Sequence, residues 1–394
     1  MRRANLAIGL LALGQTIAWA GIYYIFAALL LTWERETSWS KSELTLALAM
    51  AVLASGLAAP VVGRLIDRGY GSVTMGLSTA LGGAAVLYLG TVDDLTRFYA
   101  TWVAIGIAQA GALYEACFAI ITRSSGGAAR GGITAITLIA GFASAIAFSG
   151  AAWLGEGEDW RSVALVFGAT TVAVAAPASF LGARLIESPA DLKTLPTKTS
   201  PKRRATAPRK LMLLIAAAFP MMALNHGIIL NHLLPLLDER GVASATAVFA
   251  ASLIGPMQVA GRIVIMLAGS RVSPLAAVLT SFGGVVVAAL ILLLSQMAPL
   301  LIFVSVVLQG ATYGLISILK PLIIAEFSGP DGIARVLGWM ALPYLACFAV
   351  APYLGALIWK VGGYDLVLMA AAGFATLGFL AMALAAQLRK RYTV

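Results

Sequence analysis

The residues of this sequence that could bind or move a charged substrate are the few ionisable side chains inside its long apolar stretches. Arg262 is the most informative of these, because it lies nine residues before Arg271, the base that ends its apolar stretch. At 1.5 Å per helical residue, that spacing puts Arg262 roughly 13 Å inside a membrane boundary, close to the middle of a bilayer. A planar guanidinium can hold a carboxylate through two parallel hydrogen bonds. The position predicts an anion site, and the alternative is a side chain that reaches for the interface, as Arg64 would.

Glu115 is the acidic residue that lies deepest within an apolar stretch. A carboxyl group removed from water holds a proton more readily, so Glu115 is a candidate proton carrier. A fixed ion pair with a neighbouring base is the alternative. Lys320 and Glu326 lie near the inner end of another stretch, where we expect them to snorkel or to form a gate pair.

Neutral polar side chains in the same stretches are candidates for the wall of a substrate site. His226 is a second candidate proton carrier, and it is six residues from His232. No acid or thiolate completes a ligand set around them, so we expect no metal. We expect substrate contacts from Arg262, Gln258, Tyr23, Tyr24, Tyr114, Asn225, His226, Gln309, Tyr313 and Tyr344. Each of the neutral groups could instead be a hydrogen bonder between packed helices.

Motifs for catalysis are absent from the sequence. It contains no P-loop, no G-x-S-x-G elbow and no His-Glu-x-x-His. We therefore expect neither an enzyme nor an ATP-driven pump, and no cofactor.

Composition identifies an integral membrane protein. Of the 394 residues, 60% are hydrophobic and only 11% are charged, whereas a soluble domain carries about 25% charged residues. The net charge of +10 does not indicate nucleic acid binding, because the bases lie between apolar stretches. Cys117 and Cys347 both lie inside such stretches and are expected to be packing residues.

Windows of about 20 apolar residues predict an all-α fold of twelve transmembrane helices. The expected spans lie near 5–32, 42–66, 71–91, 96–122, 131–154, 161–185, 209–237, 243–269, 273–296, 298–325, 333–358 and 364–388. Residues 187–210 interrupt them with nine charged residues and four prolines among 24. A segment of this kind cannot form a core and is too rich in proline for a helix. It is expected to be a basic linker between an N-terminal six-helix bundle, residues 1–186, and a C-terminal one, residues 211–394.

The charges between the spans predict the orientation. The loops on one side hold six of the 27 bases and eleven of the 17 acids. Because bases accumulate on the cytoplasmic side, we expect the linker and both termini to be cytoplasmic in an inner membrane.

The two halves repeat weakly. Gly111-Ala112-Leu113-Tyr114 recurs as Gly310-Ala311-Thr312-Tyr313 after 199 residues, and Gly63-Arg64 recurs as Gly261-Arg262 after 198. A shared offset predicts parallel repeats, as in transporters that rock two six-helix bundles around a central site.

The segment from Gly63 to Gly71, which closes the second expected span, reads GRLIDRGYG. It resembles the G-x-x-x-D-R-x-G signature of the major facilitator superfamily of transporters, with Gly63, Asp67 and Arg68 in register and the last glycine one place late, at Gly71. The resemblance implies a cytoplasmic gate at these four residues. Glycines permit a tight turn, and Asp67 at a helix end can meet a helix N-terminus or a base. A plain solvated turn is the alternative.

Within that superfamily the chain resembles bacterial relatives of the monocarboxylate and oxalate–formate transporters. Trp39-Ser40 begins the second span as it does in those proteins, and Arg262 lies well inside the eighth. Gln258 replaces the acid that the monocarboxylate family has four residues before that arginine. The fifth span lacks the Gly-Pro pair of drug–proton antiporters.

These features together predict a monomeric secondary transporter that moves a small organic anion, a monocarboxylate, with a proton and by alternating access. The alternatives are an exporter of amphipathic organic compounds or drugs by proton antiport, which would depend on Glu115 and not on Arg262, and a membrane sensor that has lost transport. Its expected partners are the anion, the proton and membrane lipid, without nucleic acid.

Overall fold

The computed structural model describes residues 2–125, 129–155, 159–187, 209–328 and 333–392, and within these ranges every regular element is a helix. The predicted linker, residues 187–210, lies mostly outside the described residues. Its ends do not, since the helices extend to Glu187 and begin again at Arg209.

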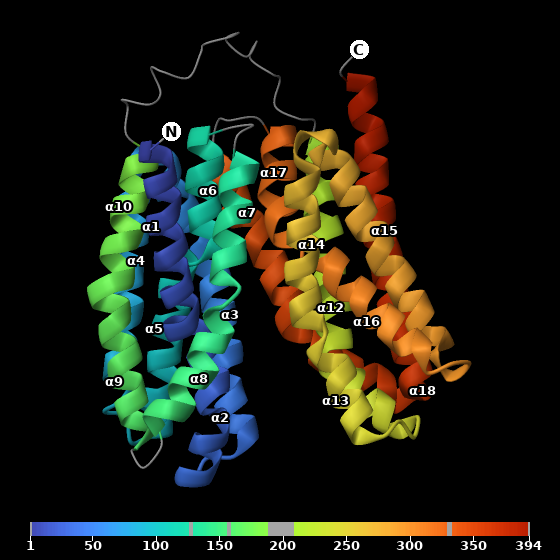
Figure 1. Ribbon diagram of the computed structural model, residues 1–394, viewed down its shortest axis with the longest axis horizontal. Helices are drawn as coiled ribbons and strands as arrows, with labels where there is room; N and C mark the ends of the chain where they lie inside the picture. The colour runs from blue at the N-terminus through green and yellow to red at the C-terminus, as the bar shows by residue number, and fades with distance from the viewer. Residues whose placement is uncertain (1, 126–128, 156–158, 188–208, 329–332, 393–394) are drawn as a thin grey trace. The chain divides into compact units, whose positions relative to one another are not determined.

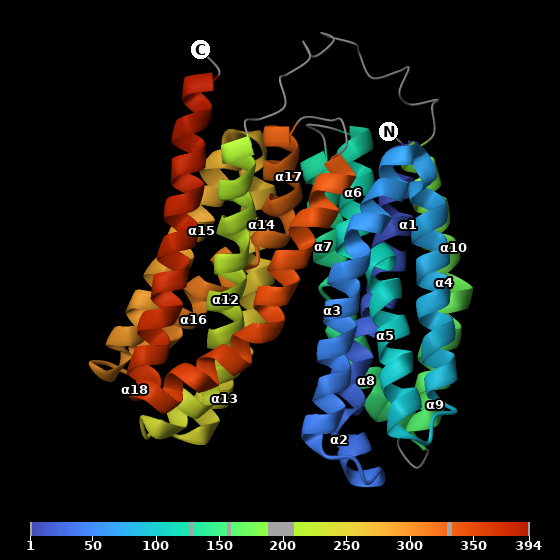
Figure 2. The same cartoon turned by 180° about the vertical axis from the view of Figure 1, so that it is seen from behind.

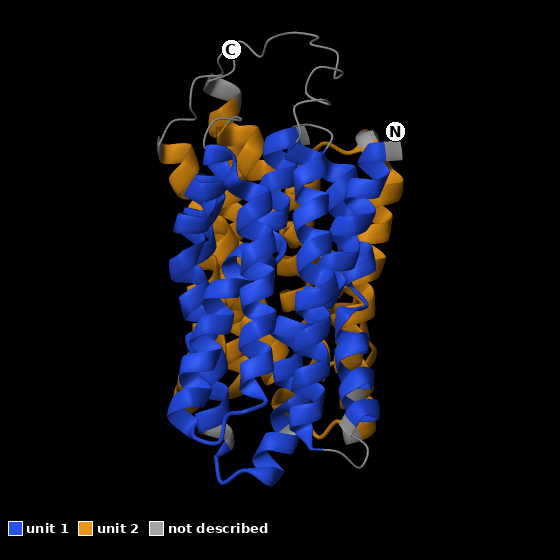
Figure 3. Cartoon of the chain, turned by 90° about the vertical axis from the view of Figure 1, so that its left-hand side faces the viewer, with its two compact units in different colours: residues 1–203, 330–342 blue, residues 204–329, 343–394 orange. Residues whose placement is uncertain are grey.

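The chain divides into two compact units (Figure 3). Unit 1 is Met1–Arg203 together with Pro330–Leu342, and unit 2 is Arg204–Gly329 together with Pro343–Val394. The segment Pro330–Leu342 belongs to the second half of the sequence, yet it groups with the first half. Close backbone packing explains this, because an added Cβ on Gly338 would lie 2.4 Å from the carbonyl oxygen of Ala59.

Unit 1 is a bundle of upright helices (Figure 1). Its elements in chain order are α1 (Arg2–Ala18), η1 (Trp19–Tyr24), α2 (Ile25–Glu36), α3 (Lys41–Leu65), η2 (Ile66–Tyr70), α4 (Gly71–Leu89), α5 (Leu95–Ala112), α6 (Tyr114–Ser125), α7 (Ala129–Ala140), α8 (Ala143–Gly155), α9 (Trp160–Thr170), η4 (Thr171–Ala175) and α10 (Ala176–Glu187). Helix α5 packs between the antiparallel α3 and α4 (Figure 2), and α1 packs against α7 and α10.

Unit 2 is built from the remaining helices. They are α12 (Arg209–Glu239), α13 (Ser244–Ser252), α14 (Ile254–Ala268), η5 (Gly269–Arg271), α15 (Pro274–Leu293), η6 (Leu294–Gln296), α16 (Leu300–Tyr313), α17 (Ile316–Ser328) and most of α18 (Ile333–Tyr392). Helix α16 packs against both α14 and α15, and α12 packs against α13 and α17.

Ten helical segments of the described chain are long and apolar enough to cross a membrane. Two of them, Glu43–Leu89 with 47 residues and Ile333–Arg389 with 57, have about twice the length that one crossing needs. Each contains a glycine with positive φ, Gly69 at 89° and Gly363 at 66°. Division of these two segments at their glycines is consistent with the twelve predicted spans.

Several spans that the sequence predicts as single helices are broken in the middle. The fourth breaks at Leu113, which is extended with φ −94° and ψ −166°, and the tenth breaks between Tyr313 and Ile316. The first break falls within the repeated Gly-Ala-x-Tyr sequence, and the second directly follows it. The first span changes to a π-helix at η1. Such interruptions free backbone groups that must find partners inside the membrane.

Glycines let the helices of each unit approach closely. An added Cβ on Gly106 would lie 2.1 Å from the carbonyl oxygen of Ala51, which joins α5 to α3. An added Cβ on Gly261 would lie 2.0 Å from the carbonyl oxygen of Ala311, which joins α14 to α16. Close contact of this kind replaces the hydrophobic effect as the source of helix association in lipid.

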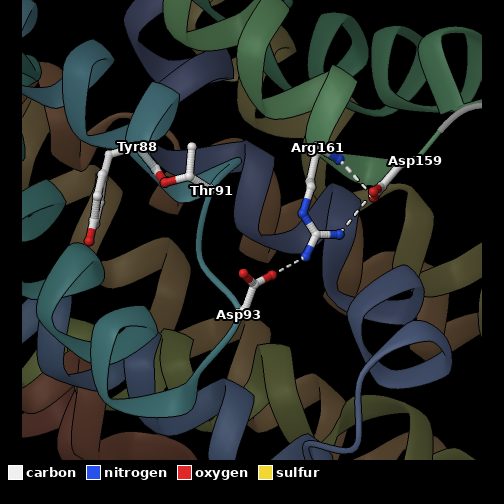
Figure 4. Close-up of polar contacts among 5 residues, drawn as sticks. All are labelled: Tyr88, Thr91, Asp93, Asp159 and Arg161. Carbon is white, nitrogen blue, oxygen red and sulfur yellow. Dashed lines mark hydrogen bonds and ion pairs between the residues drawn. The ribbon is translucent and has the colours of Figure 1, made fainter.

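Arginines tie the loops together at the end of each unit that carries the acid-rich loops. In unit 1 the guanidinium of Arg161 binds Asp93 at 2.6 Å and Asp159 at 2.9 Å (Figure 4). In unit 2 Arg240 binds Asp365 at 2.6 Å and donates to the Ser295 hydroxyl at 2.7 Å.

Gly261→Ala is expected to destabilise the protein, because its added Cβ has no room beside Ala311. Overpacking costs about 1–3 kcal/mol, more than the ~0.5–1 kcal/mol that alanine gains over glycine in a helix. Thermal unfolding in detergent measures the loss. Gly255→Ala is the matched control in the same helix, with nothing within 4 Å of its added Cβ, and should leave Tm unchanged or higher. Equal effects of the two substitutions would contradict this account.

Candidate functional site

The predicted site residues fall in both units, and each unit has a polar or aromatic cluster of its own. Tyr23, Tyr24, Tyr114 and Glu115 lie in unit 1. The gate residues Gly63, Asp67, Arg68 and Gly71 also lie in unit 1, whereas the remaining expected substrate contacts, including Arg262 and His226, lie in unit 2.

The cluster in unit 1 is aromatic and forms around the π-helix η1. The ring of Trp19 lies 4.9 Å from that of Tyr23, 5.9 Å from that of Tyr24 and 4.7 Å from that of Tyr114, measured between centroids. Tyr114 in turn stacks on Phe118 at 4.8 Å. The structure therefore brings together the three predicted tyrosines, and Trp19 is the residue that joins them.

Two glutamine side chains in unit 1 donate hydrogen bonds to backbone carbonyl oxygens at the places where the helices are interrupted. Gln15 donates to the carbonyl oxygen of Ala112 at 2.7 Å, at the end of α5. Gln109 donates to the carbonyl oxygen of Ile22 at 2.8 Å, within η1. The N-terminal half of the fourth span, α5, is thereby joined to the first span by two hydrogen bonds, one donated by each span. Glu115 lies in the first turn of α6, directly after this break, and is half-buried.

Unit 2 contains a chain of buried polar contacts that begins at a backbone carbonyl. Asn225 donates through Nδ2 to the carbonyl oxygen of Ala371 at 2.9 Å. Gln309 donates through Nε2 to Oδ1 of Asn225 at 2.9 Å, and the same Nε2 lies 3.4 Å from Nδ1 of His226. These side chains are 4% exposed or less. Three predicted contacts, from two different helices, thus form one network.

The chain of contacts continues from His226 to a lysine. The imidazole of His226 stacks on the ring of Tyr313, with centroids 3.6 Å apart and planes 13° apart. The hydroxyls of Tyr313 and Tyr344 lie 2.8 Å apart. The ammonium of Lys320 stands 4.2 Å above the ring of Tyr344. Five of the predicted residues therefore lead to Lys320, which the sequence analysis placed at an interface or gate.

Lys320 is 8% exposed, so its expected snorkelling is a wrong prediction. Its expected partner, Glu326, forms an ion pair with Arg389 instead. The positions of the two residues in α17 explain why they do not pair. Lys320 lies in the first half of the helix, well inside the span, whereas Glu326 lies near the end of the helix. The signal that could have identified Lys320 is its nearness to the Tyr313 repeat.

Arg262 donates a hydrogen bond to a carbonyl oxygen at the helix break in unit 2, as Gln15 does at the helix break in unit 1. Its Nε donates to the carbonyl oxygen of Gly314 at 3.1 Å, just after α16 ends, and the side chain is 9% exposed. The backbone and Cβ of Gln258 pack against Gly314 in the same place. The membrane span here is Ala245–Ala268, so Arg262 lies roughly 8 Å beyond its middle. It is therefore farther from the bilayer centre than the sequence spacing predicts, though still buried.

Asn231 and His232, two further polar residues of α12, make their contacts outside this network. Asn231 bonds the carbonyl oxygen of Gly227 in its own helix at 2.8 Å. His232 bonds the carbonyl oxygen of Pro352 through Nε2 at 2.9 Å, in space left by Gly355.

Asp67 of the predicted gate lies at a helix N-terminus, one of the two positions expected for it. Its carboxylate accepts from the backbone N–H of Ala334 at 3.0 Å and of Arg335 at 2.8 Å. These are the first free donors of α18, where the helix dipole favours a negative charge. Gly63 permits the contact, because an added Cβ would lie 2.3 Å from the carbonyl oxygen of Ala334. Arg68 is exposed.

A second carboxylate, not predicted, completes this corner of unit 1. Glu187 accepts from the backbone N–H of Ser72 at 2.8 Å, at the start of α4, and lies 3.9 Å from Arg123. An added Cβ on Gly71 would lie 2.3 Å from Oε1 of Glu187. Gly71 therefore makes room for this acid, while the left-handed turn itself is at Gly69. In the sequence Glu187 is the first residue of the predicted linker, because the charged, proline-containing run begins there.

Asp67→Ala is expected to loosen the start of α18, since it removes the acceptor for two backbone donors. Loss of an N-terminal cap costs about 0.5–2 kcal/mol, so amide exchange in residues 333–342 should accelerate by up to roughly 30-fold. Hydrogen–deuterium exchange read by mass spectrometry measures this. The neighbouring Arg68→Ala, which removes an exposed base, should leave the exchange unchanged. The same protection in Asp67→Ala and the parent would refute the cap.

Comparisons with known proteins agree with this architecture. The family model described as Major Facilitator Superfamily matches residues 11–298, almost three quarters of the chain. No curated protein sequence matches the chain. Among solved structures, the E. coli fucose:proton symporter FucP is similar with TM-score 0.67 and 14% identity over 96% of this chain and 98% of that one.

Two further structures show the same fold. The proton:xylose symporter XylE, bound to 6-bromo-6-deoxy-D-glucose, has TM-score 0.72 and 9% identity over 96% of this chain and 95% of that one. The human organic anion transporter MFSD10 (TETRAN) has TM-score 0.66 and 16% identity over 97% and 99%. The family match covers well over half of the sequence, and the chain therefore belongs to the Major Facilitator Superfamily, as a transporter and not an enzyme.

Proposed function

We propose that this protein is a secondary transporter that moves a small organic anion, a monocarboxylate, together with a proton by alternating access. The charge of its buried side chains carries the proposal. Arg262 and Lys320 are 9% and 8% exposed, and no Asp or Glu of the described residues is buried to that degree. Both bases belong to unit 2. Burying a charge inside a membrane span is costly unless the charge meets a partner, and two buried bases create a potential that favours an anion.

The two bases differ in what they offer a carboxylate. Arg262 keeps its Nε–H on the carbonyl oxygen of Gly314, which fixes the plane of the guanidinium. A guanidinium in general can offer a carboxylate two parallel hydrogen bonds. Lys320 offers a point charge held over the ring of Tyr344. The paired hydroxyls of Tyr313 and Tyr344 would orient a neighbouring oxygen of the substrate.

Glu115 is the proton carrier that we propose. It begins α6 at the break in the fourth span and adjoins Tyr114 of the aromatic cluster. The fold suits proton coupling and anions in other chains, since FucP and XylE are described as proton symporters and MFSD10 as an organic anion transporter. A proton on Glu115 would neutralise its charge when the anion binds, so that the loaded protein reorients.

Asp67 is the proposed latch of the cytoplasmic side. It holds the first residues of α18 to unit 1, while the rest of that helix groups with unit 2 from Pro343 onward. Release of its two hydrogen bonds would free the helix to move with unit 2. We further propose, from the distribution of bases, that both termini are cytoplasmic in an inner membrane. We also propose that the protein acts as a monomer.

The aromatic cluster of unit 1 supports a second candidate, an exporter of amphipathic compounds by proton antiport. Trp19, Tyr24 and Tyr114 present apolar ring surface beside Glu115. Such a site would bind hydrophobic or cationic compounds through stacking and charge. This transporter would depend on Glu115 and tolerate loss of Arg262.

Arg262→Ala is expected to lower uptake of labelled lactate or pyruvate into proteoliposomes at least tenfold, because the carboxylate loses its paired donors. Lys320→Met should raise KM, since it removes one of the two buried charges. The matched controls are Arg271→Ala and Lys360→Met, which remove exposed bases and should not change uptake. Uptake that survives both Arg262→Ala and Lys320→Met would remove the anion site from unit 2.

Glu115→Gln is expected to abolish accumulation driven by a pH gradient while it preserves exchange of labelled for unlabelled anion. The amide keeps the shape of the carboxyl group but cannot release a proton. Paired measurements of net uptake and exchange in the same vesicles separate the two outcomes. Glu34→Gln, at an exposed position, is the control. Gradient-driven accumulation that persists in Glu115→Gln would assign the proton elsewhere.

A further inference from the structure

We propose that the amide pair Asn225–Gln309 holds His226 as the neutral imidazole with its proton on Nε2. In this role His226 is a fixed hydrogen-bond donor of the substrate site, and the coupling proton is carried elsewhere. The assignment to the substrate site rests on the proposed function. The assignment of the ring proton rests on the contacts alone.

One group at the end of this network has a hydrogen-bonding role that cannot change. The carbonyl oxygen of Ala371 can only accept a hydrogen bond, and the amide of Asn225 lies 2.9 Å from it. Asn225 must therefore present its nitrogen to Ala371. Its oxygen then faces Gln309, and because that oxygen also only accepts, Gln309 must present Nε2, 2.9 Å away.

The donor and acceptor roles in this network also determine which nitrogen of the imidazole is unprotonated. Nε2 of Gln309 has a second proton, and Nδ1 of His226 lies 3.4 Å from it, a long contact that still sets the polarity. Nδ1 faces a donor and must be the unprotonated nitrogen. In a neutral ring, the proton is therefore on Nε2.

The unsatisfied oxygen of Gln309 shows that Asn225 fixes the orientation of the Gln309 amide. Oε1 of Gln309 is buried without a hydrogen-bond partner among the described residues, which costs about 1–3 kcal/mol. Reversing the amide would not relieve this cost, because it would set Oε1 against Oδ1 of Asn225, two acceptors in contact. The orientation of Gln309 thus follows from its neighbour.

Burial and stacking keep the ring in place. Asn225 is 0% exposed, Gln309 is 1% and His226 is 4%, so water cannot readily replace a lost partner. The ring of Tyr313 lies parallel to the imidazole at 3.6 Å and holds its plane. A proton on Nδ1 would oppose the N–H of Gln309, and relief would require both amides to reverse and the bond to Ala371 to break.

The ring proton can be observed directly, because the chain has only two histidines. We would label the full-length protein with 15N-histidine and assign each ring nitrogen by its couplings to the ring protons, with His232→Gln leaving the single signal of His226. The expected result is an unprotonated Nδ1 and a protonated Nε2. Gln309→Met, which removes the donor, should introduce a population with Nδ1 protonated. A protonated Nδ1 in the parent, or identical spectra in parent and Gln309→Met, would overturn the proposal.

Transport distinguishes a donor from a proton carrier. His226→Gln places an amide near the position of Nε2, whereas the shorter His226→Asn reaches only the position of Nδ1. Under the proposal, KM for lactate rises at least about threefold more in His226→Asn than in His226→Gln, and both still accumulate lactate on a pH gradient. Loss of gradient-driven accumulation with intact exchange in His226→Gln would make His226 the proton carrier. If lactate is not transported at all, the anion proposal fails while the nitrogen spectra still decide the tautomer.

Discussion

Backbone groups set free inside a membrane must be satisfied by the protein itself, and this requirement organises the structure. A carbonyl without a partner costs several kcal/mol in hydrocarbon. The chain nevertheless interrupts its helices at η1, at Leu113 and after Tyr313. Long polar side chains from neighbouring helices reach each site: Gln109 bonds Ile22, Gln15 bonds Ala112 and Arg262 bonds Gly314. These three polar side chains therefore have a structural role, because each supplies a hydrogen bond to a carbonyl oxygen at an interrupted helix.

In both repeats a long polar side chain bonds a carbonyl oxygen at the helix break, but the chemistry of that side chain differs between the two units. In unit 1 the side chain at the break is the neutral amide of Gln15, and the surroundings are aromatic. In unit 2 it is the cation Arg262, and a chain of buried polar contacts leads to a second base, Lys320. Unit 1 therefore has ring surface near Glu115, and unit 2 has two buried bases. Transport of an anion with a proton would need a group of each sign.

Two carboxylates in unit 1 likewise satisfy backbone groups, in this case the N–H donors at the starts of helices. Asp67 satisfies the first donors of α18, and Glu187 satisfies a donor at the start of α4. A charge on a helix end can be stable in one arrangement and released in another without leaving an ion buried in lipid. This property suits a latch better than a buried ion pair, since breaking a buried pair strands a charge.

The amino-acid sequence alone determined the helical membrane class and predicted a tight turn within residues 63–71, because hydropathy and glycine act locally along the chain. It also indicated the Gly-Ala-x-Tyr repeat and the acid at Asp67. Only the tertiary structure decided which polar residues meet. Asn225 and Ala371 are 146 residues apart, and Gln309 joins them to His226. The burial of Lys320 and the contact of Arg262 with Gly314 were equally invisible, because each depends on the depth and rotation of a helix in its bundle. Those quantities are set by packing against neighbouring helices, and a sequence pattern records only that a side chain is polar.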